Sequence, residues 1–73
     1  MIKISSAMRQ DDIIDLLNAN EEEGISFTFK EKQGIALFFE TDAEDKERAA
    51  QLAKEQIKAQ DWGSVLFFQS IAV

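Results

Sequence analysis

The middle of the chain, residues 25–41, carries two runs of apolar residues separated by a polar turn. In the first run, Phe27 and Phe29 alternate with polar residues, which is the period of a β-strand with one buried face. The turn reads Glu31-Lys32-Gln33-Gly34, and glycine suits a backbone position with positive φ. This pattern predicts a β-hairpin around which the rest of the fold is built.

The length of the hairpin loop decides which residues of the second strand are buried, because one extra residue exchanges the two faces. A three-residue loop ending in a bulge at Gly34 pairs Phe29 with Leu37 and leaves less apolar surface outside. We therefore favour this register, in which Ala36 and Phe38 face away from the core. The inward residues are then Ile35, Leu37 and Phe39. A loop one residue longer gives the opposite assignment.

One strand and one helix are predicted on each side of the hairpin. Met1 to Ser5 alternates as a strand, and a helix follows from about residue 8 to residue 20. A second helix follows Thr41 as its N-cap and runs to about Gln60, before a last strand from Val65 to Val73 that is apolar on both sides. The apolar stripes of the two helices are Ile13, Ile14, Leu16, Leu17 and Asn20, and Ala49, Ala50, Leu52, Ala53 and Ile57.

Polar residues predict how the helices begin and end. Thr41 followed by Glu44 has the spacing of a capping box, and Glu44 to Arg48 is a favourable pair one turn apart. The run Glu21 to Glu23 opposes the negative end of the first helix, so we expect it in an exposed turn closed by Gly24. Trp62 is expected to cover one end of the core.

The resulting order, β-α-β-β-α-β, resembles the ferredoxin-like split βαβ arrangement in one α+β domain, residues 1–73. This arrangement implies an antiparallel sheet of order 4-1-3-2 with both helices on one face, leaving the other face open. The last strand and the second hairpin strand hold more apolar residues than one buried face can use. An exposed apolar patch of this kind is typical of a protein interface. The candidate interface residues are Lys3, Thr28, Ala36, Phe38, Leu66 and Phe68.

Composition narrows the functions that this arrangement can support. The 73 residues include no Cys and no His and carry a net charge of −6. Thiolate metal sites and histidine proton transfer are thereby excluded, and phosphate backbones and anionic membranes repel an acidic chain. We expect no cofactor and no metal. No apolar run is long enough for a signal peptide or a membrane span, so we expect a cytoplasmic protein.

Residues at diagnostic positions separate the chain from several families of this build. Metal-carrying domains place C-x-x-C after the first strand, where this chain has Ser5 to Arg9 without a thiol. Arg9 lacks the glycine-rich loop that acylphosphatase-like enzymes add, and the glycine usual in ACT-type ligand-binding domains is also missing. In an RNA-recognition motif, aromatic residues that stack on bases would occupy the positions of Ile35, Leu37 and, on the first strand, Lys3. This chain has no aromatic residue at any of the three.

The two clusters of carboxylates are expected to start helices and to face solvent, not to bind a cation. They are Asp11, Asp12 and Asp15, and Asp42, Glu44 and Asp45. Neither cluster has the spacing of a calcium loop. We therefore predict a non-enzymatic protein-interaction or regulatory module, homodimeric or docked on another protein through the open sheet face. The alternative is an ACT-like sensor of amino acids or nucleotides.

Overall fold

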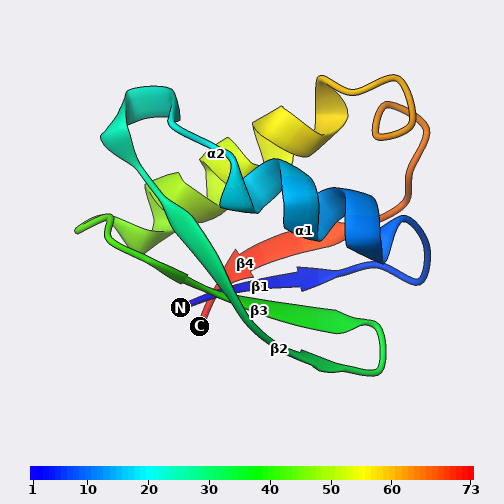
Figure 1. Ribbon diagram of the computed structural model, residues 1–73, viewed down its shortest axis with the longest axis horizontal. Coiled ribbons are helices and arrows are strands. Elements are labelled where there is room, and N and C mark those ends of the chain that lie inside the picture. The colour runs from blue at the N-terminus through cyan, green and yellow to red at the C-terminus, as the bar shows by residue number, and fades with distance from the viewer.

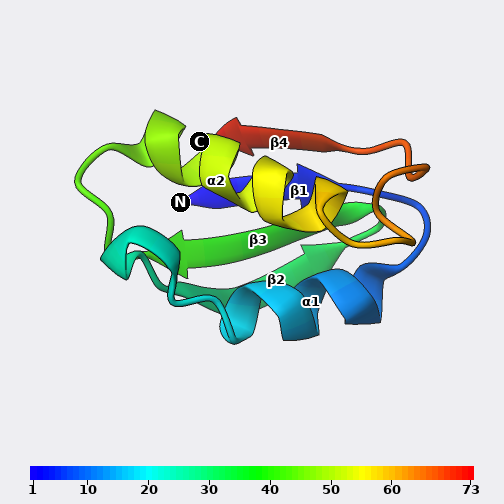
Figure 2. The same cartoon turned by 90° about the horizontal axis from the view of Figure 1, so that it is seen from above.

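The structure is a computed structural model of residues 1–73 and is an α+β fold with a four-stranded antiparallel sheet and two α-helices. Both helices lie on one face of the sheet, and the other face is open (Figures 1 and 2). The sheet order is β2-β3-β1-β4, which reads 4-1-3-2 from the other edge. The elements are β1 (Ile2–Ser5), α1 (Gln10–Asn18), a 3₁₀ turn η1 (Glu22–Gly24), β2 (Phe27–Gln33), β3 (Ala36–Thr41), α2 (Lys46–Lys58) and β4 (Gln69–Ala72).

The core lies between the helices and the sheet, and the predicted apolar stripes supply it. All five residues predicted for the inner stripe of α2 are buried. On α1, Ile13 and Leu17 are buried, whereas Ile14 and Leu16 are half-buried against the same cluster. The inner sheet face contributes Ile2, Ile4, Phe27, Leu37 and Phe39.

The hairpin loop differs from the prediction. It is a two-residue turn, Gly34-Ile35, in which Gly34 has φ +60°. Glycine at the first of two central residues fits a type II′ turn, whose twist matches that of the flanking strands. Ile35 therefore lies exposed in the turn instead of facing the core, and Leu37 pairs with Lys32 instead of with Phe29.

A β-bulge restores the face assignment that the shorter turn would have reversed. Counted from the two-residue turn, a regular ladder would place Phe29 opposite Glu40, on the outer face. The ladder shifts between Phe29 and Glu31, so Lys30 is the extra residue and Phe29 lies opposite Phe39. The two rings pack edge to face with centroids 5.6 Å apart. The prediction that Leu37 and Phe39 point inward and Ala36 and Phe38 outward is therefore correct.

The N-terminus of α2 was predicted wrongly. Thr41 ends β3, where it pairs with Phe27, and its hydroxyl accepts a hydrogen bond from the Ala43 amide. The helix begins four residues later than predicted, at Lys46, because Asp45 is the N-cap and accepts from the Arg48 amide at 3.1 Å. Both helices are also shorter than predicted, with α1 starting at Gln10 and α2 ending at Lys58.

The last strand is shorter than predicted as well. Only Gln69 to Ala72 pairs with β1, and residues 65–68 form a loop before it. Leu66 and Phe68 pack against the core, which corrects their assignment to the open face. Trp62 is half-buried against the same core, as predicted.

Candidate functional site

The open sheet face has a short row of three side chains across neighbouring strands, two of them apolar and the middle one a lysine. Lys3 of β1 lies between Phe38 of β3 and Ile71 of β4, so the three side chains share the outer face. Ile71 is 45% exposed, whereas Phe38 is half-buried. Glu31 lies opposite Phe38 on the β2 side, so a charged residue borders the row at that end.

Four of the six predicted interface residues belong to this face. They are Lys3, Thr28, Ala36 and Phe38. The other two, Leu66 and Phe68, contact the core. The open face is therefore less apolar than predicted, and its exposed apolar surface near β4 comes from Ile71 instead.

Three loops meet at one end of the molecule, on the right of Figure 1: the β1–α1 loop, the β2–β3 turn and residues 65–68. Hydrogen bonds hold the first two together. The Ser6 amide donates to the Ile35 carbonyl at 2.9 Å, and the Gln10 side chain donates to the carbonyls of Ser6 and Gly34 at 2.9 and 3.2 Å. The turn of the hairpin is thus fixed against the start of α1.

These loops hold most of the strongly exposed apolar side chains, which we call the loop-end surface: Met8, Ile35, Val65 and Phe67. Phe67 is 94% exposed and Val65 is 87% exposed. A shallow cavity of about 210 Å³ lies here, lined by Ile35, Phe67 and Phe68 together with Ser5 and Gln69. Because Ser5 and Gln69 are outer-face residues of β1 and β4, the loop-end surface is continuous with the open sheet face.

Sequence reasoning missed the loop-end surface. The sequence feature that indicates this surface is that both sides of the segment 65–68 are apolar, a pattern that also predicts a strand. Alternation correctly separated Val65 and Phe67 from Leu66 and Phe68. The prediction placed Leu66 and Phe68 in solvent, which is wrong, because alternation does not show which of the two sides faces the core.

Three of the six carboxylates in the two predicted clusters have structural partners, and one of them is the N-cap Asp45. Asp12 pairs with Arg9 at 3.2 Å, and Asp42 accepts a hydrogen bond from the Ser26 amide at 2.9 Å. This backbone hydrogen bond lowers the pKa of Asp42 below its ordinary value. No group of three or more His, Cys, Asp or Glu side chains is placed to hold a metal ion.

Arg48 joins α2 to η1. Its guanidinium binds both carboxylate oxygens of Glu23, and also contacts Glu55 at 3.3 Å. The hydrogen bond to Arg48 lowers the pKa of Glu23, and the same contact raises the pKa of Arg48. Arg48 thus pairs with Glu23 and Glu55 instead of with Glu44, and Glu23 has a partner that the sequence did not indicate.

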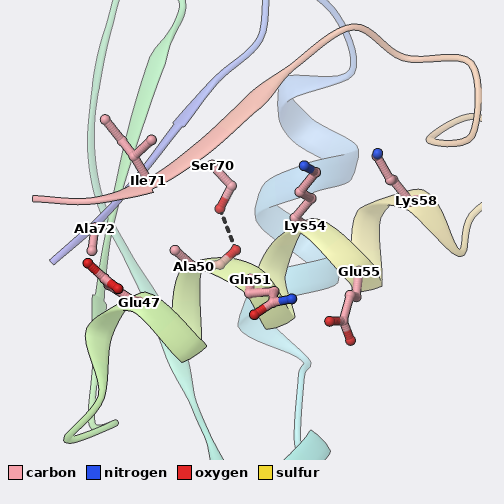
Figure 3. A pocket seen from close by; sticks show the side chains of 9 residues that line it. All are labelled: Glu47, Ala50, Gln51, Lys54, Glu55, Lys58, Ser70, Ile71 and Ala72. Atoms are coloured by element: carbon pink, nitrogen blue, oxygen red, sulfur yellow. Dashed lines mark hydrogen bonds between the residues drawn. The ribbon is translucent and has the colours of Figure 1, made fainter.

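A larger groove of about 620 Å³ runs between α2 and β4 (Figure 3). Ala50, Ser70 and Ala72 line it, and the Ser70 hydroxyl donates to the Ala50 carbonyl at 2.6 Å. Lys54 and Lys58 flank one end. The end near Ala72 carries Glu47, so the groove has a basic end and an acidic end.

Comparison with protein-family models, characterised proteins and solved structures finds no match to this chain. Neither helix is long and apolar enough to cross a lipid bilayer. The function must therefore be inferred from the surfaces described above.

Proposed function

We propose that the chain is a non-enzymatic protein-binding module of ferredoxin-like build. Its contact surface combines the loop-end surface with the adjoining row of the open sheet face. The exposure of Phe67 is the observation that carries this proposal. An aromatic ring left in water forgoes about 1.5–3 kcal/mol of burial, and aromatic side chains dominate the binding energy of protein interfaces.

The backbone on both sides of Phe67 is anchored, so its exposure is a property of the fold. Leu66 and Phe68 pack against the core, and the Leu66 amide donates to the Gly63 carbonyl at 3.1 Å. Gly63 itself is buried against the end of α2, where a Cβ would overlap the Ile57 carbonyl oxygen. A side chain presented from a fixed backbone loses less conformational entropy when it binds.

A protein partner fits this surface better than a nucleic acid or a small ligand. The chain has a net charge of −6, which opposes phosphate backbones. The loop-end cavity of about 210 Å³ is smaller than the ~300–1,000 Å³ typical of ligand pockets. The surface around it is apolar, since Phe67 and Val65 are almost fully exposed to solvent.

Site-specific photocrosslinking tests the proposal. A photoreactive phenylalanine analogue replaces Phe67 in one variant and Glu22 in a control, because Glu22 is also exposed but lies in η1, at the opposite end of the molecule (Figure 1). We expect a defined protein adduct in cell extract at position 67 only, and its loss when unlabelled wild type competes. Equal adducts at both positions, or persistence under competition, would contradict a specific surface.

The sensing alternative has its own measurement. A thermal-shift screen with amino acids, nucleotides and divalent ions detects any ligand that binds the folded chain, because binding stabilises it by mass action. If one compound raises the melting temperature by several degrees while position 67 captures nothing, the module is a ligand sensor and the protein-binding proposal is wrong.

A further inference from the structure

The two edges of the sheet are protected to very different degrees. The β2 edge carries the bulge at Lys30 and a run of charged residues, Lys30 to Lys32. The Phe29 amide on this edge is already bound, since it donates to the Asn18 side chain at 3.0 Å. A bulge, charges and covering side chains are the features by which proteins prevent an edge strand from pairing with another chain.

The β4 edge has none of these features. Gln69 to Ala72 contains no charged residue, no proline and no bulge. Met1 and Val73 exchange both backbone hydrogen bonds, at 3.2 and 2.8 Å. Because such pairs alternate along an antiparallel ladder, the amides and carbonyls of Ser70 and Ala72 point away from β1, toward the free edge. These amides and carbonyls are placed to form hydrogen bonds with one more strand.

The α2 helix beside this edge has a self-complementary charge pattern. Its groove-lining residues run from Glu47 at the N-terminal end to Lys54 and Lys58 at the C-terminal end. Glu55 also lines the groove, but its carboxylate is paired with Arg48. When two such helices lie antiparallel, the acidic end of each faces the basic end of the other.

We propose that the β4 edge and the α2 groove form a homodimer seam, occupied by a second copy of this chain. The two β4 strands pair antiparallel about a two-fold axis at Ile71, so that Ser70 of each copy lies opposite Ala72 of the other. The two four-stranded sheets become one continuous sheet. The two Ile71 side chains are then direct cross-strand neighbours, and each α2 closes the groove of the other copy.

The seam and the surface in the proposed function share Ile71, but the α2 groove belongs to the seam alone, so charge reversal on α2 separates them. We expect sedimentation velocity on a concentration series to show a wild-type dimer. The acidic variant, Lys54→Glu with Lys58→Glu, and the basic variant, Glu47→Lys, each place like charges opposite one another and are expected to weaken the dimer at least about tenfold. An equimolar mixture of the two variants is expected to restore dimer mass as a heterodimer.

Two further variants make the assignment specific. Ala72→Pro removes one edge amide that faces away from β1, so it is expected to weaken the dimer while retaining the β1–β4 ladder. Phe67→Ser is expected to leave the dimer unchanged. Far-ultraviolet circular dichroism confirms that each variant is folded.

Four results would overturn the seam: a monomeric wild type at millimolar concentration, folded charge-reversed variants that dimerise as tightly as wild type, a mixture that stays monomeric, or a dimer that Phe67→Ser abolishes. The last result would instead place the contact between copies at the loop-end surface. Loss of crosslinking at position 67 with an intact dimer would contradict the proposed function and leave the seam standing.

Discussion

The bulge at Lys30 gives a sharp test of how the sheet buries its aromatic residues. Deleting Lys30 removes the residue that has no partner and leaves a regular ladder, in which Phe29 still faces Phe39 and Glu31 still faces Phe38. Deleting Thr28, two residues earlier, shortens the same strand by the same amount. This deletion makes Phe27 and Phe29 direct neighbours in the strand. Because successive side chains of a strand point to opposite faces, one of the two phenylalanines must then lie on the outer face.

The two deletions are expected to lower the free energy of unfolding by very different amounts. Without Lys30 the chain loses one exposed ion pair, Lys30 to Glu40 at 3.5 Å, which is worth about 0–1 kcal/mol. Without Thr28 a phenylalanine leaves the core, at a cost of about 3–5 kcal/mol. A domain of this size has a free energy of unfolding near the lower end of about 5–15 kcal/mol. The Thr28 deletion is therefore expected to leave the chain largely unfolded.

Urea unfolding followed by the fluorescence of Trp62, the only tryptophan, measures both effects. We expect the Lys30 deletion to retain a cooperative transition within about 1 kcal/mol of wild type, and the Thr28 deletion to lose most of its folded baseline. If both deletions destabilise the chain equally, the bulge is not what sets the inward direction of the two phenylalanines, and the register between β2 and β3 is wrong.

Three other substitutions probe single contacts. Gly63→Ala is expected to cost about 3 kcal/mol in urea unfolding, because its Cβ would overlap the backbone of Ile57, which cannot rotate away. Asp45→Ala removes the N-cap of α2 and is expected to cost about 1 kcal/mol by the same measurement. Glu23 has a pKa lowered from 4.5, so its ionised form stabilises the folded state. The stability difference between wild type and Glu23→Gln is therefore expected to be full above pH 4.5 and to shrink as the pH falls below it.

The helices and the element order were predictable because their signal is local and periodic. The α2 stripe from Ala49 to Ile57 repeats at helical spacing, and burial of that stripe is what holds the helix on the sheet. The hairpin faces were also correct, although for a different reason than expected. A two-residue turn plus one bulge leaves the same residues inside as the predicted three-residue loop, apart from Ile35 in the turn itself.

The errors lie where pairing with a distant segment decides the structure. Thr41 has the sequence of a cap but is held in β3 by its pairing with Phe27, so Asp45 begins the helix. The segment 65–68 alternates like a strand but has no partner, because β1 ends at Ser5, which pairs with Gln69. Alternation in the sequence shows which residues share a side of the chain. The segment becomes a β-strand only where a neighbouring strand pairs with it.

The directions of the strands relate the two proposed surfaces to one another. β4 runs from the loop end toward the chain termini (Figure 1), so antiparallel pairing of two β4 strands places the loop ends at opposite ends of the joined sheet. Phe67 of each copy then remains exposed, and neither copy blocks the other. A dimer of this kind binds two partner molecules independently. A partner that carries two binding sites would gain avidity, whereas a monomeric Lys54→Glu, Lys58→Glu variant would bind it only through one site.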